Sequence, residues 1–436
     1  SVYGRDWLTV TTDEAHEYRR FGRKYHAIFT LRLRSRFFAA LTATPLNTKA
    51  LDIWNIARIM GIGWFLEHGE SALEMEKELA SAQRKDRKFR KDNPNVYSDH
   101  LHGRGGTYAS ESSKCMVKWI EVIRDQFKGY VIRRTIASVD HNGAPLINLP
   151  PYVEVNLRLT LYPREYEVLD ELAEDYLESG RGASTVSLFF AAFYLLGRRG
   201  SLHPNANPSY ASPPPKTKDD WNTSSSAKLD TILRLVKYHL EADGRPPIVM
   251  ATAPSSSPVS SPVEGEIDID DVVPPAGQNR FISHPQEGSR DYSGMPPDKV
   301  VLYSFFPMNF DLMTGILEAN GIKVAAMSGS QSMAIRASIL RQFTQSGRDG
   351  IRVLILSGVG TVGLNIAEAN ILIIVDVMWS VLSEQQLIGR LWRHPQKKTV
   401  LVYRLFGEGT PDTLINTLSV EKGQLADAFT NVSGTL

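Results

Sequence analysis

The stretch from Ile351 to Gln396 constrains the fold of this chain more than any other. It holds two apolar runs, IRVLIL and ILIIVD, which flank a glycine-rich turn and precede a helical pattern. Short apolar runs bounded by turn residues are typical of strands buried in a parallel sheet. Similar runs over 300–305, 322–327 and 399–406 alternate with helical patterns. We therefore expect an α/β fold in which helices cover both faces of a parallel sheet.

The glycine-rich turn, Gly358 to Gly363, matches the G-x-G-x-x-G pattern of dinucleotide-binding folds, and Asp376 follows at the end of the next apolar run. The match fails on length, because only residues 364–370 separate the turn from that run. A crossover between parallel strands needs about 10–12 residues or more. We therefore interpret the turn as one whose backbone N–H groups face a phosphate or a neighbouring domain.

Composition limits the number of domains, the kinds of partner and the use of disulfide bonds. The 436 residues suggest two or three domains, and the formal net charge of +1 leaves any nucleic-acid contact to local patches. The single cysteine, Cys115, excludes an internal disulfide framework, and no apolar run is long enough to span a membrane. Between 201 and 297 proline and serine are frequent and an acidic run covers 264–271, so we expect a mostly disordered insertion with one amphipathic helix near 227–240.

The helical pattern over 384–393 carries Gln386, Arg390 and Arg393 at spacings i, i+4 and i+7, which predicts that all three lie on one face. Surface arginines are usually only solvated. Two arginines directly after a strand–turn–strand unit also suit a second role, because guanidinium groups bind a γ-phosphate and stabilise the charge that develops in phosphoryl transfer.

A second signal lies near the start of the chain, where the tetrapeptide Asp13-Glu14-Ala15-His16 follows the β-branched run DWLTVTT. A carboxylate at the end of a buried strand is where Mg²⁺ on a triphosphate is held, so Asp13 is the expected metal ligand. Glu14 is placed to orient or deprotonate an attacking water. Taken alone, the tetrapeptide could also be a chance acidic sequence.

The order of these motifs resembles that of the SNF2 (Swi2/Snf2) family of superfamily 2 DNA-dependent ATPases. DEAH resembles motif II, and LTATP, over 41–45, resembles motif III. YVIRRT, over 130–135, is similar to the element that closes the first lobe. SGVGTVGLNI and QQLIGRLWR resemble motifs V and VI.

The resemblance implies two RecA-like lobes, the first incomplete, with helical insertions and a long disordered insertion. The implied organisation is the C-terminal part of lobe one over 1–148 with a helical insertion at about 64–128, a connector over 149–200, the disordered insertion over 201–297, and lobe two over 298–436.

It also implies roles for individual residues. Asp13, Glu14, Arg390 and Arg393 are the implied catalytic residues, with Asp13 on the metal. ATP binding and the coupling of hydrolysis to lobe movement are implied for His16, Thr42, Thr44, Gln386 and Gly363. Contacts at the lobe or nucleic-acid interface are implied for Ser357, Gly358 and Asn365.

The implied cofactors are ATP and Mg²⁺, the implied partner is duplex DNA, with nucleosomes or other chromatin proteins beside it, and the implied location is the nucleus. No stretch matches G-x-x-x-x-G-K-[ST], and only 12 residues precede Asp13, so this chain by itself is expected to be inactive. Three functions stay open: a DNA-stimulated ATPase that moves along duplex DNA in chromatin remodelling or repair, a catalytically inactive remnant that binds DNA or a protein, and an RNA helicase.

Overall fold

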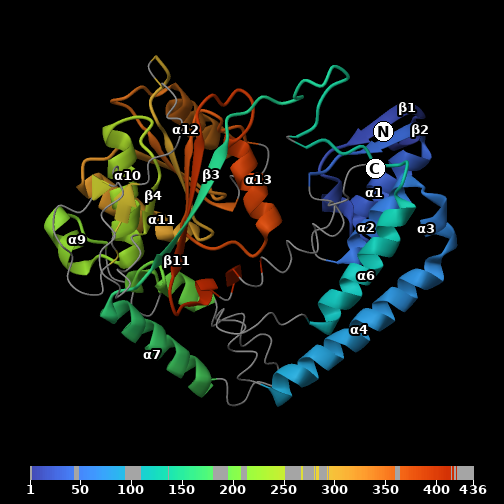
Figure 1. Ribbon diagram of the computed structural model, residues 1–436, viewed down its shortest axis with the longest axis horizontal. Helices are drawn as coiled ribbons and strands as arrows, with labels where there is room; N and C mark the ends of the chain where they lie inside the picture. The colour runs from blue at the N-terminus through green and yellow to red at the C-terminus, as the bar shows by residue number, and fades with distance from the viewer. Residues whose placement is uncertain are drawn as a thin grey trace, which may run out of the picture. The chain divides into compact units, whose positions relative to one another are not determined.

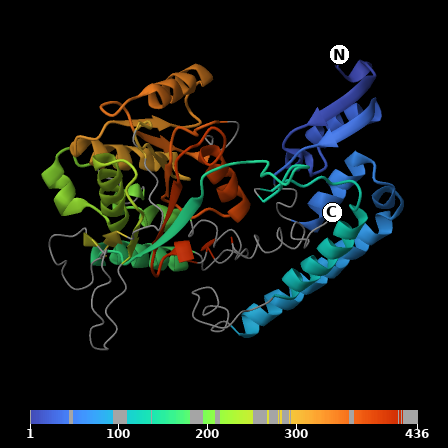
Figure 2. The same cartoon turned by 45° about the horizontal axis from the view of Figure 1, so that its top comes forward.

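The computed structural model divides the chain into two compact units, which are described one at a time (Figures 1 and 2). The first unit contains Ser1–Asn148, Trp379–Glu384 and Thr417–Leu436, and the second contains Leu149–Met378 and Gln385–Asn416. The structure describes residues 2–43, 49–93, 110–135, 137–179, 195–207, 214–250, 267–268, 279, 281–283, 292, 294–358, 364–413, 415–416 and 419. None of the helices in these ranges is both long and apolar enough to span a membrane.

The first unit contains a pair of parallel strands joined by a helix. Strands β1 (Trp7–Thr12) and β2 (Ser35–Ala40) are parallel, and α1 (Arg23–Leu33) lies between them in the chain. The pairing continues past the strand ends, because the Leu41 N–H donates to the Thr12 carbonyl at 2.8 Å and the Ala15 N–H donates to the Leu41 carbonyl at 2.8 Å. The residues that follow β1 and β2 are therefore held side by side.

The other helices of the first unit form their own core. They are α2 (Ala50–Met60), α3 (Gly63–Glu67), α4 (Gly69–Asp92) and α6 (Glu111–Gln126). The apolar face of each helix contributes to one cluster, in which Trp54 and Phe65 are fully buried and meet edge to face with ring centroids 4.9 Å apart.

The second unit is built on a six-stranded sheet in which every pairing is parallel. Its strands, in spatial order, are β3 (Tyr152–Leu159), β11 (Val400–Gly407), β10 (Ile371–Ile374), β7 (Val300–Tyr303), β9 (Val353–Leu356) and β8 (Val324–Met327). The four strands β7, β9, β10 and β11 read as continuous apolar runs because they are buried on both faces. This confirms the expected parallel α/β fold.

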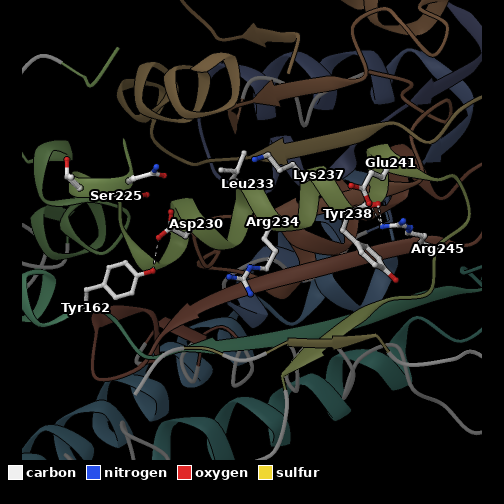
Figure 3. A pocket seen from close by; sticks show the side chains of 11 residues that line it. Tyr162, Ser225, Asp230, Leu233, Arg234, Lys237, Tyr238, Glu241 and Arg245 are labelled. Atoms are coloured by element: carbon white, nitrogen blue, oxygen red, sulfur yellow. Dashed lines mark hydrogen bonds and ion pairs between the residues drawn. The ribbon is translucent and has the colours of Figure 1, made fainter. Parts of the chain in front are cut away.

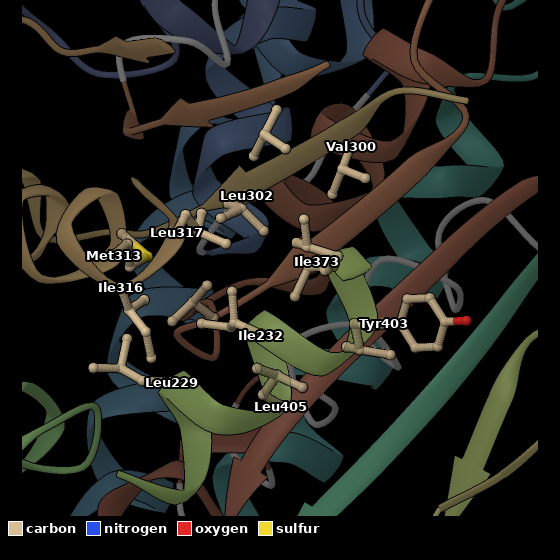
Figure 4. Close-up of a cluster of buried hydrophobic side chains, with 14 of the residues drawn as sticks. Leu229, Ile232, Val300, Leu302, Met313, Ile316, Leu317, Ile373, Tyr403 and Leu405 are labelled. Carbon is tan, nitrogen blue, oxygen red and sulfur yellow. The ribbon is translucent and has the colours of Figure 1, made fainter. Parts of the chain in front are cut away.

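Alternate residues of these strands enter two separate cores. On one face, Leu302, Ile373 and Tyr403 pack against α10 (Ala227–Glu241) and α11 (Phe310–Ala319), as Figure 4 shows. On the other face, side chains such as Leu354 and Leu372 pack against α12 (Met333–Gln345) and α13 (Val381–Leu391). Helices thus cover both faces, and the carboxyl ends of all six strands lie at one edge.

The stretch 201–297 contains more regular structure than was expected. The predicted helix is present as α10, but α9 (Lys218–Ser224) precedes it, and a small antiparallel sheet joins β4 (Ile248–Met250), β6 (Phe281–Ser283) and β5 (Ile267–Asp268). The expectation of disorder was wrong for these residues. The average composition hid short apolar runs that form strands only because a partner strand is available; residues 251–266 and 269–278 lie outside the described ranges.

Glu165 joins two helices of the second unit at their first turns. It lies in α7 (Pro163–Ser179), and its Oε2 accepts hydrogen bonds from the Tyr162 N–H at 2.8 Å and from the Ala227 N–H, at the start of α10, at 3.0 Å. Its side chain is almost completely buried. Burial raises the pKa of Glu165 to about 7, against the opposing effect of these two N–H groups.

Because this pKa lies above its value of 4.5 in an unfolded chain, Glu165 contributes stability that is complete below pH 4.5 and is lost as the pH rises to about 7. We predict that Glu165→Gln removes this contribution to the pH dependence. The wild-type unfolding free energy should fall by up to about 3 kcal/mol more than that of the variant over this range. Urea denaturation at several pH values measures the difference, and parallel curves for the two proteins would contradict the assignment.

Candidate functional site

The first group of predicted residues lines a hollow in the first unit. A cavity of about 670 Å³ is bordered by Asp13 and Glu14 after β1, by Thr42 after β2 and by Arg133 and Arg134. The polar side chains reach it because parallel strands end at the same edge, while the apolar wall comes from α2. Negative and positive side chains therefore border one space that is large enough for a small ligand.

Asp13, the predicted magnesium ligand, lies directly after the end of β1. Its carboxylate is exposed at the end of β1, and its Oδ1 accepts a hydrogen bond from the Glu14 N–H at 2.8 Å. The described residues contain no group of three or more His, Cys, Asp or Glu side chains that could hold a metal ion. A single carboxylate fits Mg²⁺ that takes its other ligands from phosphates and water, because Mg²⁺ usually keeps several waters.

Glu14 has an uncommon backbone conformation. Its φ and ψ are 49° and 53°, and it is the one non-glycine residue with positive φ in the described part of the chain. For an L-residue other than Gly, Asn or Asp the left-handed region costs roughly 1–2 kcal/mol. Backbone strain of this kind is concentrated at functional sites, where the surrounding structure enforces it.

His16 links the DEAH segment to the segment after β2. Its ring is buried, and Nδ1 lies 3.1 Å from the Thr42 hydroxyl and 3.4 Å from Glu14 Oε2. The structure thus brings together four of the residues selected from the sequence, namely Asp13, Glu14, His16 and Thr42. Thr44 lies outside the described residues.

The second group of predicted residues lies in the second unit, at the carboxyl edge of its sheet. Ser357 and Gly358 follow β9 and border a hollow of about 340 Å³ together with Phe305 after β7 and with Ser328 and Ser330 after β8. Ser357 is buried, and its hydroxyl has no hydrogen-bond partner among the described residues. The hydroxyl and backbone groups at this edge suit an anionic oxygen.

Sequence reasoning missed the Ser328-Gly329-Ser330 segment. A usable signal was present, because these small polar residues directly follow an apolar run at the end of a strand. Ligands bind at the carboxyl ends of the strands in open α/β sheets. Asn365, which was selected, is exposed but does not border the hollow, and Gly363 lies outside the described residues.

The arginine helix is shorter than predicted. Helix α13 ends at Leu391, so Gln386 and Arg390 lie on the helix, whereas Arg393 follows its end and is exposed. The prediction that helical spacing places all three on one face was therefore wrong for Arg393. Gln396 holds the turn that follows the helix in place. Its buried amide donates to the Ala369 and Ala367 carbonyls at 2.8 and 3.0 Å.

Asp376 is unavailable to a nucleotide ribose. It is buried, and its Oδ2 accepts hydrogen bonds from the Ser304 hydroxyl at 2.5 Å and from the Phe305 N–H at 3.0 Å. Burial raises its pKa above the usual range of an aspartate. This agrees with rejection of the dinucleotide-binding interpretation.

A wider hollow of about 840 Å³ follows the exposed side of α10 and contains none of the predicted residues (Figure 3). Its charged side chains have local partners. Arg245 pairs with Glu241 at 2.8 Å, the Tyr162 hydroxyl donates to Asp230 at 2.7 Å, and Lys237 donates to Asn320 at 2.7 Å. These pairings account for its polar character without a ligand.

Part of this chain is similar to known proteins. Residues 291–395 match the family described as "Helicase conserved C-terminal domain". Over 113 residues, or 26% of this chain, the sequence is 34% identical to the DNA repair protein rhp54 of Schizosaccharomyces pombe and 33% identical to the DNA repair and recombination protein RAD54-like of Homo sapiens. These matches cover 13% and 15% of the two relatives, so the chain spans only a small part of their length.

Among solved structures, the C-terminal part of the Fun30 ATPase domain aligns with a TM-score of 0.42 and 17% identity, covering 65% of this chain and 100% of that one. This likeness is too low to carry an argument. The function proposed for this chain therefore depends on the sequence matches and on the site geometry described above.

Because the Ser357 hydroxyl has no hydrogen-bond partner in the described part of the chain, we predict that Ser357→Ala leaves the unfolding free energy within about 1 kcal/mol of the wild type. Ser304→Ala is the matched control. It removes a buried hydrogen bond to Asp376 and should cost about 1–3 kcal/mol. Denaturant unfolding of both variants tests this, and an equal loss in the two would show that Ser357 has a structural role.

Proposed function

Because the chain is an SNF2-type, superfamily 2 helicase-like protein, we propose that it forms part of an ATP-dependent motor that moves along duplex DNA. The observation that carries the proposal is that the matched stretch 291–395 contains both the serine-lined hollow and the arginine helix. DNA is the proposed polymer because the relatives are named as DNA repair proteins. Chromatin remodelling or repair in the nucleus is the setting that this proposal entails.

The proposed chemistry assigns each group a task that suits its surroundings. Asp13 would hold Mg²⁺ on ATP, and the metal, when bound, would supply positive charge beside the phosphates. Glu14 orients and deprotonates water, which is consistent with a side chain that its unusual backbone fixes beside His16. Arg390 and Arg393 supply positive charge to the phosphoryl group in transfer, and Gln386 orients the nucleotide.

His16 and Thr42 are proposed to couple hydrolysis to movement, because one hydrogen bond joins the segment that would contact Mg²⁺ to the segment after β2. In the second unit, Ser328, Ser330 and Ser357 are proposed to bind phosphates of the DNA backbone. Hydroxyl and backbone N–H contacts of this type position a protein on DNA without reading its sequence.

We predict that Arg393→Ala lowers DNA-stimulated ATP turnover by the full-length protein about a thousandfold, as expected for loss of an arginine that stabilises the transition state. Arg341→Ala removes another exposed arginine, on α12, and serves as the control. Steady-state ATPase assays with saturating duplex DNA measure the effect. Unchanged turnover by Arg393→Ala would contradict the role assigned to this arginine.

The same assay separates the competing functions. Stimulation by duplex DNA but not by RNA supports the proposed motor, whereas stimulation by RNA alone supports an RNA helicase. If the full-length protein binds duplex DNA but hydrolyses no ATP, it acts as a binding module instead.

A further inference from the structure

Two buried cations hold the backbone that leads from the sheet of the second unit to α13. Lys228 Nζ donates to the Val375 carbonyl at 3.2 Å, and Arg198 donates to the Val377 carbonyl at 2.5 Å. Both side chains are almost completely excluded from solvent. They come from positions 147 and 179 residues earlier in the chain than the carbonyls that they contact. Two distant parts of the sequence therefore meet at one short connection.

Both cations depend on partners from other elements. Lys228 lies in the first turn of α10, where the helix dipole disfavours positive charge. Its ammonium is stabilised by Asp412 Oδ2 at 2.6 Å, which also accepts the Gly407 N–H at 3.1 Å. Burial lowers the pKa of Arg198, whose guanidinium lies over the rings of Phe305 and Phe306. A buried charge is costly without such partners, so these contacts explain why the cations are there.

The residue between the two carbonyls is held as well. Asp376 accepts hydrogen bonds from Ser304 and from the Phe305 N–H, both directly after β7. Three consecutive residues, Val375 to Val377, are thus fixed by groups from different elements. Strand β10 has already ended at Ile374, so these contacts, and not only sheet pairing, determine the path of the chain.

This connection leads directly to the arginine helix. Helix α13 begins at Val381, and its inner side chains Leu387, Ile388 and Leu391 pack in the core under the sheet. Core packing alone permits small shifts of a helix along its axis. A fixed entry point removes that freedom, and a shift of about 1 Å at a catalytic group can change a rate about a hundredfold.

We propose that Lys228 and Arg198 are positioning residues for Arg390 and Arg393, acting through the backbone of residues 375–377. The proposal rests on the function proposed above for the two arginines. Hydrogen bonds to charged groups are stronger than those between neutral groups, which suits them to fixing a connection against movement.

The test uses the double variant Lys228→Met with Asp412→Asn in the full-length protein. Removing both charges avoids leaving Asp412 buried without its partner, so most of the stability should be kept, while the bond to Val375 is lost. We expect amide hydrogen exchange across 381–391 to become about tenfold faster, in line with loss of a hydrogen bond from a charged donor. We also expect kcat for DNA-stimulated ATP hydrolysis to fall about tenfold with an unchanged KM for ATP.

Tyr403→Phe controls for a general loss of stability. Its hydroxyl accepts the Ile248 N–H at 3.0 Å and lies 2.8 Å from His239 Nε2, on the opposite face of the sheet from α13. This variant should not accelerate exchange in α13 more than in the rest of the unit. Arg198→Met, which removes the bond to Val377, should reproduce the α13 effect and replaces the double variant if that protein does not fold.

Exchange in α13 that equals the wild type in both the double variant and Arg198→Met would overturn the proposal, and so would equal acceleration throughout the unit. Failure of the proposed function is a separate result, because it would appear as unchanged turnover in Arg393→Ala. Hydrogen exchange reports on the connection whether or not the arginines act on ATP.

Discussion

Burial of both faces of the parallel sheet in the second unit is the constraint on which the rest of that unit depends. A parallel strand cannot return to the sheet through a tight turn, so each connection must cross a face, and the helices that make these crossings cover the cores. The same geometry places every carboxyl end at one edge. Ser328 and Ser357 are 29 residues apart in the sequence, yet they border one hollow because β8 and β9 are paired neighbours.

In the first unit, a single pair of parallel strands has the corresponding effect on a smaller scale. The hydrogen bonds that continue past β1 and β2 keep the segments after them together, and the contact between His16 and Thr42 depends on this pairing. Glu14 takes a conformation that its residue type disfavours at the end of this pair. The left-handed backbone of Glu14 therefore coincides with the residue that the sequence selected to orient or deprotonate water.

Buried charge has a different role in the second unit. Buried charges add little stability beyond that of an apolar core, since the cost of desolvation offsets much of their attraction. This holds for Lys228, Asp412 and Arg198. Their role is instead to fix the path of the backbone, because a hydrogen bond fixes the position of a carbonyl more narrowly than apolar packing does. This accounts for cations at a connection where sheet pairing ends, since the Val375 N–H still donates to the Tyr303 carbonyl at 2.9 Å but the carbonyls of Val375 and Val377 are held by Lys228 and Arg198.

The sequence by itself determined the parallel α/β class, the helix α10 and the groups of catalytic candidates, because continuous apolar runs, 3.6-residue periodicity and motif order are local properties. It misplaced the end of α13 and missed the strands β4, β5 and β6. The turn after α13 is held by a hydrogen bond from the Gln396 amide to the Ala369 carbonyl, and each of the three strands pairs with a neighbouring strand, so both features depend on contacts outside the local sequence. Residue type would assign Lys228 and Arg198 to the surface, because charged side chains are rarely buried. Only the tertiary structure placed them beneath the entry to α13, because the carboxylate and carbonyl groups that make their burial favourable come from other elements.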